Sequence, residues 1–233
     1  LGFDTAQLGF IHAISGDASD FGAQGLLQLI QGVAGRRHAV EHEHLGSPGT
    51  EVVVRTGTVG DPFRALRLTA PDQVRVVVLG QDPYPRPGHA DGLAFSAAHG
   101  RPVSLRRIFA VLAADRPGFV PPASSRLDAW AQQGVLLLNP VLTVEVGQIG
   151  SHLACGWQAL TSEIIKILCN RSDPPVFLLW GSQAQTFFEQ ACPAGASPPL
   201  LRTRHPSNDF RREFMAQGSH FAATAHLVDW WAL

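Results

Sequence analysis

The chain has 233 residues, of which 45% are hydrophobic and 16% are charged, a composition that supports a sizeable core and is typical of a globular and not of a disordered protein. Its formal net charge is -1, so the chain lacks the overall basic character of many nucleic-acid-binding proteins. No apolar run approaches the roughly 18 residues of a membrane span and no signal-peptide profile begins the chain, so we expect an intracellular, cytoplasmic protein.

Residues 1–50 carry weak helical periodicity, which is clearest between Leu26 and Val33. They end in a stretch rich in Gly, His and Glu, at 35–49, that is typical of a loop. We interpret 1–50 as a divergent helical segment and loop belonging to the same single domain as residues 51–233.

Four short apolar runs follow, with helix-like segments between them. Each run is continuous and not alternating, which is the pattern of a strand buried on both faces of a sheet. Strands that alternate with helices predict an α/β domain with a parallel sheet covered by helices on both faces. The predicted strands are Val74–Leu79, Val135–Leu138, Val176–Trp180 and Leu200–Thr203, and the predicted helices are Leu105–Ala114, Leu127–Gln133, Trp157–Cys169 and Gln183–Gln190.

The first predicted strand leads into a Gly/Pro-rich loop, Gly80–Gly88, that contains Gln81, Asp82 and the only tyrosine of the chain, Tyr84. The prolines fix φ and stiffen the loop, so Asp82 and Tyr84 are held in place. Taken alone, such a loop is more often a capped turn whose aspartate accepts hydrogen bonds from nearby backbone N–H groups.

Two other predicted strands also end in polar residues. The second is followed by Asn139, and the fourth is followed by His205 and Ser207. The carboxyl ends of parallel strands meet at one edge of a sheet, where ligands bind in α/β proteins. Together with Asp82 and Tyr84, these side chains predict a functional site at that edge.

The segments named so far resemble the family-1 uracil-DNA glycosylases. The run G-Q-D-P-Y directly after a hydrophobic strand is highly specific for that family, and the likeness continues in collinear order from about Asp61 to Phe221. The first 50 residues do not take part. The matching segments are Asp72–Tyr84, Gly92–Ser96, Trp130–Val144, Ser151-His152, Gly156-Trp157, Val176–Ser182, His205–Ser207 and His220-Phe221.

The resemblance implies a four-stranded parallel sheet and a monomeric enzyme that flips uracil out of single-stranded or duplex DNA. The enzyme would hydrolyse the N-glycosidic bond and leave free uracil and an abasic site. In this scheme Asp82 positions the attacking water and stabilises the sugar cation, and His205 donates a hydrogen bond to uracil O2 as the base departs. No metal and no other cofactor is implied.

The resemblance also assigns the residues that recognise the base. Phe95 stacks under the uracil ring, and Asn139 pairs with its polar edge, so that cytosine would leave buried polar groups unpaired. Tyr84 packs against C5 and blocks the methyl group of thymine. Gln81 supports the site through its backbone.

Three serines would hold DNA phosphates: Ser96, Ser104 and Ser207. Contacts from hydroxyls and backbone N–H groups need no net positive charge, which answers the objection that the chain is nearly neutral. Four arginines near His205 would add local positive charge: Arg202, Arg204, Arg211 and Arg212.

Two departures from the family pattern stand near these residues. Pro85 follows Tyr84 where the family usually has histidine, and Asp209 occupies the place of a leucine that fills the gap left by the flipped base. An acid cannot fill an apolar gap and would repel phosphate, so the candidate wedge is Arg211, with Phe210 close behind. The same replacement argues against binding of the family's phage-encoded protein inhibitor, which grips that leucine.

Other classes of function lack their motifs. The chain has no H-x-E with P-C-x-x-C for a zinc deaminase, no Walker motif and no G-x-S-x-G, and three cysteines are too few for an iron–sulfur cluster. The acidic and histidine-rich stretch His38–His44 could bind a metal, although a solvated loop is the simpler interpretation. The alternative that stays open is a uracil- or abasic-site-binding protein on the same scaffold with weak turnover.

Overall fold

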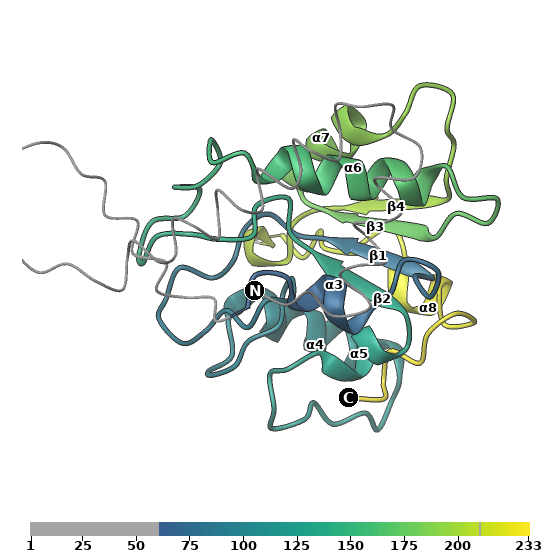
Figure 1. The fold of residues 1–233 in the computed structure, drawn as a ribbon. Helices are drawn as coiled ribbons and strands as arrows, with labels where there is room; N and C mark the ends of the chain where they lie inside the picture. The colour runs from purple at the N-terminus through teal and green to yellow at the C-terminus, as the bar shows by residue number, and fades with distance from the viewer. Residues whose placement is uncertain (1–60, 210) are drawn as a thin grey trace, which may run out of the picture.

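The computed structural model describes residues 61–209 and 211–233. The predicted helical periodicity and loop within 1–50, the His38–His44 stretch and Phe210 all lie outside the described residues. A four-stranded parallel sheet in the order β2-β1-β3-β4 forms the centre of the described part (Figure 1). Its strands are β1 (Val76–Leu79), β2 (Val135–Leu138), β3 (Val176–Trp180) and β4 (Leu200–Thr203).

The strand register brings the carboxyl ends together at one edge, as the sequence predicts. The last residue of β1, Leu79, pairs with Leu138 of β2 on one side and with Leu179 of β3 on the other. The bounds of β2, β3 and β4 agree with the prediction, whereas β1 begins at Val76 and not at Val74. The carbonyl of Val74, just before β1, accepts a hydrogen bond from the Arg171 guanidinium at 2.7 Å.

Burial of every strand on both faces was a wrong expectation for β4. The side chains of β1 and β2 are fully buried, but those of β4 are only half-buried and Arg202 is exposed. Both β2 and β4 are edge strands, but α3 (Arg64–Leu68) and α5 (Asp128–Gln132) pack against β2, whereas the main neighbour of β4 is β3.

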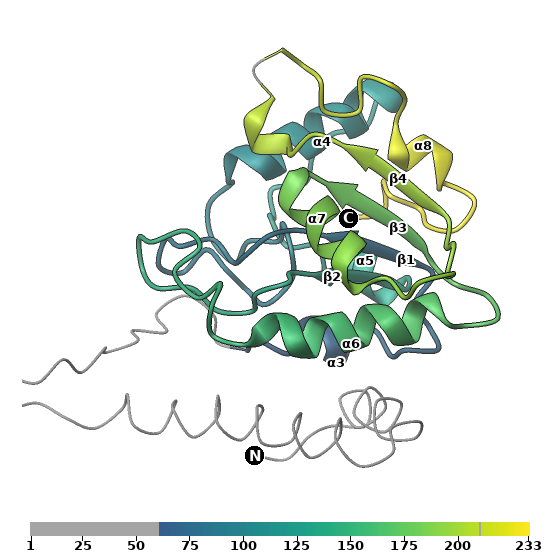
Figure 2. The same ribbon diagram turned by 90° about the horizontal axis from the view of Figure 1, so that it is seen from above.

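Helices cover both faces of the sheet, as predicted. Figures 1 and 2 show α6 (Trp157–Cys169) and α7 (Ser182–Ala191) on one face, with α4 (Val103–Asp115) and α5 (Asp128–Gln132) on the other. Three short helical pieces were not expected, because a single turn is too short for an apolar period. They are α3 (Arg64–Leu68), the 3₁₀ turn η1 (Pro206–Asn208) and α8 (His220–Ala223).

An aromatic cluster supports the sheet below the predicted site. The rings of Trp130 and Trp230 meet edge to face with centroids 4.9 Å apart, and Trp180 at the end of β3 packs against Phe214 and Phe221. Each of these rings is almost completely buried. The described part contains no helix long and apolar enough to cross a membrane.

Candidate active site

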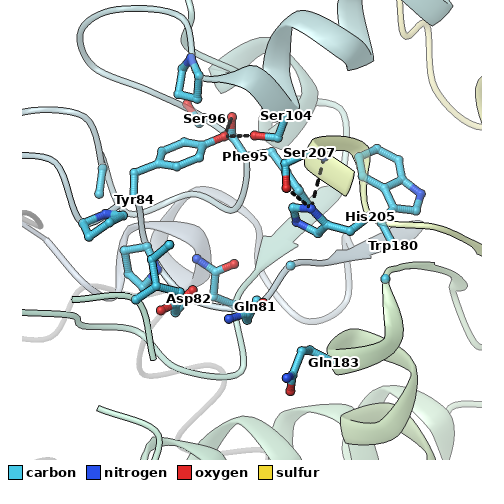
Figure 3. A pocket seen from close by; sticks show the side chains of 18 of the residues that line it. Gln81, Asp82, Tyr84, Phe95, Ser96, Ser104, Trp180, Gln183, His205 and Ser207 are labelled. Atoms are coloured by element: carbon cyan, nitrogen blue, oxygen red, sulfur yellow. Dashed lines mark hydrogen bonds between the residues drawn. The ribbon is translucent and has the colours of Figure 1, made fainter. Parts of the chain in front are cut away.

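A pocket of about 500 Å³ opens at the carboxyl edge of the sheet. Side chains that follow all four strands line it, together with Phe95 and Ser104 (Figure 3). The sequence-predicted residues in its wall are Gln81, Asp82 and Tyr84 after β1, Asn139 after β2, and His205 and Ser207 after β4. The structure therefore brings together residues that are up to 126 positions apart in the chain, from Gln81 to Ser207.

Two glycines allow neighbouring strand ends to approach each other closely. A Cβ atom on Gly80 would lie 2.2 Å from Asn139 Oδ1, so a larger residue after β1 would displace that amide. A Cβ atom on Gly181, after β3, would lie 2.8 Å from His205 Cβ, and Gly181 also has a φ of +102° that side chains disfavour. The positions of Asn139 and His205 thus depend on glycine in the adjacent strand end.

Asp82 is held by a loop that is distant in the sequence. Its Oδ2 accepts a hydrogen bond from the backbone N–H of Gly150 at 2.7 Å. Burial raises the pKa of Asp82, and the Gly150 hydrogen bond opposes that change by stabilising the carboxylate. The neighbouring Ile149 lines the same pocket and is 69% exposed. Neither Gly150 nor Ile149 was predicted as a site residue, since the G-Q-D-P-Y segment does not indicate which distant loop contacts Asp82.

His205 is arranged as a neutral hydrogen-bond donor. Its Nδ1 accepts the backbone N–H of Ser207 at 3.2 Å and lies 2.7 Å from the Ser207 hydroxyl. Because Nδ1 is an acceptor, the proton of the neutral ring is on Nε2. Burial lowers the pKa of His205, which favours this neutral form.

Phe95 and Tyr84 form the rigid aromatic part of the wall. The Phe95 ring lies 5.1 Å from the Trp180 ring and 5.6 Å from the His205 ring, and its backbone has a φ of 64°. The Tyr84 hydroxyl donates to the Phe95 carbonyl at 3.0 Å and contacts Ser104 Oγ at 2.7 Å. Burial raises the pKa of Tyr84, so the phenol stays protonated and keeps both contacts.

The three serines expected at phosphates differ in exposure. Ser207 is exposed beside His205, whereas Ser104 is only 3% exposed and contacts Tyr84. The Ser96 hydroxyl donates to Asp91 at 2.7 Å and accepts the Leu127 N–H at 3.0 Å, in a side chain with no exposure. The Ser96 hydroxyl therefore joins two loops, Ser96 also lines the pocket, and its contact with a DNA phosphate stays a prediction.

The Asp209 side chain, which we expected to repel phosphate, points into the protein. It is 6% exposed, forms an ion pair with Arg107 of α4 and accepts the backbone N–H of Phe214 at 2.8 Å. The expectation that this acid would repel phosphate is wrong, because its charge is turned inward and compensated. Arg211, two residues later, is exposed.

The other arginines near the site are partly neutralised. Arg202 pairs with Glu189, and Arg204 pairs with Glu213. Among the described residues, no group of three or more His, Cys, Asp or Glu side chains could hold a metal ion.

The site combines a half-buried carboxylate, a neutral imidazole donor, an amide and a stacking ring in one pocket. This set is suited to recognising a flat polar ring and cleaving the bond that joins it to a sugar, without a second carboxylate. The fold and site therefore define a base-excising N-glycosidic hydrolase.

Comparison with known proteins identifies the family. Residues 67–229 match the model of the Uracil DNA glycosylase superfamily. The chain is 46% identical over 184 residues to the uracil-DNA glycosylase of Albidiferax ferrireducens, a match that covers 72% of this chain and 74% of that protein. It is 40% identical over 200 residues to the enzyme of varicella-zoster virus, covering 82% of this chain and 64% of the viral protein.

The fold is shared with a solved structure at lower identity. The crystal structure of mimivirus uracil-DNA glycosylase superposes with a TM-score of 0.65 and 22% identity, covering 88% of this chain and 70% of that one. This chain belongs to the uracil-DNA glycosylase superfamily, and it is an enzyme that excises uracil from DNA.

Proposed function

We propose that Asp82 and His205 carry the cleavage of the glycosidic bond. The carboxylate orients water and opposes the positive charge that develops on the sugar, and His205 Nε2–H donates to uracil O2 as negative charge develops on the base. The observation that supports this most directly is the acceptor role of His205 Nδ1 toward the Ser207 N–H, which leaves the ring proton on Nε2. A neutral imidazole can donate this hydrogen bond without first taking up a proton from solvent.

Recognition of uracil is assigned to three further side chains. Phe95 supplies the stacking face, and Asn139 supplies one donor and one acceptor to the polar edge of the ring. Tyr84 closes the space beside C5, and its hydroxyl contacts give that wall little freedom to retreat from a methyl group. Gln81 contributes its backbone: its carbonyl accepts the N–H of Val141 at 3.4 Å, which ties the β1 loop to the β2 loop.

The test of the catalytic proposal is an assay on single-stranded uracil DNA in EDTA, with alkali to cleave abasic sites. We expect full turnover by the wild-type chain in chelator. Asp82→Asn should bind DNA but lose about 3 to 5 orders of magnitude in turnover, because it loses the charge that opposes the sugar cation. Asp72→Asn, at a site away from the pocket, is the matched control.

Three results would count against this proposal. Wild-type activity in Asp82→Asn would remove Asp82 from the mechanism, and loss of activity in EDTA would direct attention to His38–His44 as a metal site. DNA binding without uracil release by the wild-type chain would favour the alternative, a uracil- or abasic-site-binding protein.

We further propose that Arg211 fills the gap left in duplex DNA by the flipped base. Its exposure and its place four residues beyond Ser207 support this role, and a long guanidinium can both enter a stack and face phosphate. Arg211→Ala should lose about 1–3 kcal/mol more on duplex than on single-stranded uracil DNA, the amount expected for one lost stacking contact. Phe210→Ala is the parallel variant, and equal losses on both substrates would exclude either residue as the wedge.

The remaining assignments concern partners and location. The proposed substrate is uracil in single-stranded and duplex DNA, acted on by a monomer in the cytoplasm. A variant of the mimivirus enzyme has been solved in complex with UGI. For this chain we propose weak or absent binding of such an inhibitor, since Asp209 offers no apolar side chain for it to grip.

A further inference from the structure

The ion pair between Asp209 and Arg107 lies at the base of the loop that follows His205. The Asp209 side chain is 6% exposed and that of Arg107 is 27% exposed, so the pair is partly removed from water. Arg107 belongs to α4, while Asp209 follows η1 directly. Because the contact joins elements about 100 residues apart in the chain, it fixes this loop against a helix from the other side of the pocket.

Asp209 also determines the shape of the loop itself. Its second carboxylate oxygen accepts the Phe214 N–H at 2.8 Å, and its carbonyl accepts the Arg212 N–H at 3.2 Å. The backbone N–H of Met215 then bonds to Thr203 Oγ1 of β4 at 2.7 Å. These bonds hold Asp209 and residues 212–215 in place, and the side chains of Arg211 and Arg212 beside them are exposed.

The same helix holds the pocket wall. Ser104, in the first turn of α4, contacts the Tyr84 hydroxyl at 2.7 Å, and Arg107 lies one turn further along. Movement of the loop relative to α4 would therefore change the distance between the loop and the uracil pocket. Duplex DNA has to meet both at once, because the flipped base enters the pocket while the loop faces the vacated stack.

We propose that Asp209 and Arg107 form an internal latch that orders residues 211–214 for duplex DNA before the DNA binds. Both are positioning residues, and neither contacts the nucleic acid. The proposal rests on the assignment of this loop to duplex DNA. A loop that is already ordered avoids the entropy cost of being ordered on binding, and this saving matters most where base flipping itself is costly.

The test uses two neutral variants of closely similar size, Asp209→Asn and Arg107→Met, and their double variant. The asparagine keeps an oxygen for the Phe214 N–H, so the change removes the charge alone. Each single variant should lower kcat/KM on duplex uracil DNA roughly tenfold, equivalent to about 1.4 kcal/mol, and on single-stranded DNA by about twofold or less. The kcat/KM of the double variant on duplex DNA should be no lower than that of the less active single variant, because the two residues act through one contact.

A conservative variant and a control pair complete the design. Arg107→Lys keeps the positive charge and should retain most of the activity on duplex DNA. If Asp209→Asn does not fold, the comparison of Arg107→Lys with Arg107→Met tests the proposal in its place. Lys166→Met and Glu163→Gln disrupt an exposed ion pair on α6 and should leave the ratio of duplex to single-strand activity unchanged. Thermal unfolding of every variant checks that the comparison is made between folded proteins.

Two outcomes would overturn the latch. The first is a ratio of duplex to single-strand activity that is unchanged in both single variants. If activity falls equally on both substrates and the Tm is lower, the ion pair has a purely structural role. The second is a double variant whose loss is the product of the single losses, which would mean independent residues. Failure of the wild-type chain to release uracil from single-stranded DNA would instead contradict the catalytic proposal, and the two failures are therefore distinguishable.

Discussion

Asp82, the carboxylate proposed for catalysis, weakens the fold around it when it is ionised. Burial raises its pKa above the ordinary value of 3.8, so the ionised form is less favourable in the folded chain than in the unfolded chain. Its contribution to stability is therefore fully present below pH 3.8 and is lost as the pH rises through the folded-state pKa. The ionised form, which the proposed mechanism needs, is the one that the fold tolerates less well.

The raised pKa of Asp82 leads us to expect a pH-dependent gain in stability when its charge is removed. At pH 7 the Asp82→Asn variant should be more stable than the wild-type chain, because it removes a partly desolvated charge and keeps an oxygen for the Gly150 N–H. The difference should shrink as the pH is lowered toward 4 and should vanish once Asp82 is protonated in both states. Urea unfolding at a series of pH values measures this, and a variant less stable than wild type at pH 7 would contradict it.

Single residues differ in how far the sequence predicts them. Asp82, Asn139 and His205 each follow an apolar run, so their meeting at one edge follows from the geometry of a parallel sheet. The Gly150 N–H that holds Asp82 could not be predicted, since the contact joins loops 68 residues apart. The inward direction of the Asp209 side chain was also missed, because a family pattern gives a residue's position in the chain and not the direction of its side chain.

At the level of secondary-structure elements, glycine residues allow the ends of neighbouring strands to approach each other closely. The interaction between Gly80 and Asn139 couples the ends of β1 and β2, which pair along their whole length. Replacing Gly80 by alanine should displace the Asn139 amide and lower kcat/KM for uracil DNA about tenfold or more, since a misplaced amide leaves the polar edge of the base unpaired.

The cause of that loss can be isolated in a second background. Asn139→Ala removes the oxygen that the new Cβ would meet, and the next nearest atom, Ala94 Cβ at 3.3 Å, is a milder contact. Adding Gly80→Ala to Asn139→Ala should therefore cost about twofold or less. A loss as large as in the wild-type background would mean that Gly80 matters for another reason, such as folding of β1.

The elements themselves were predicted as far as periodicity allows. The apolar runs of β2 and β3 are long enough to define their own limits, and α6 has a full apolar face. The short α3 and α8 are stabilised by tertiary contacts and capping and not by a pattern of their own; for example, the Ser219 hydroxyl accepts the Ala222 N–H at the start of α8. The exposure of β4 depends on which elements pack against each edge strand, and local sequence does not encode this.

At the scale of the whole molecule, the distribution of charged side chains matters more for DNA binding than the net charge. The net charge of -1 first suggested a poor fit to DNA. In the structure, Arg107, Arg202 and Arg204 are engaged by Asp209, Glu189 and Glu213. The exposed Arg211 and Arg212 make no ion pair within the described part of the chain.

The internal pairing of these arginines has a consequence for the counterions around DNA. An arginine already neutralised by a carboxylate displaces few cations when a phosphate approaches, so binding should release fewer ions than the number of arginines suggests. We expect log K for uracil DNA to fall with log salt at a slope no steeper than about -4, against roughly -5 to -9 for proteins with 6 to 10 phosphate contacts. Titrations between 50 and 200 mM salt measure the slope, and a steeper one would mean that DNA breaks the carboxylate pairs as it binds.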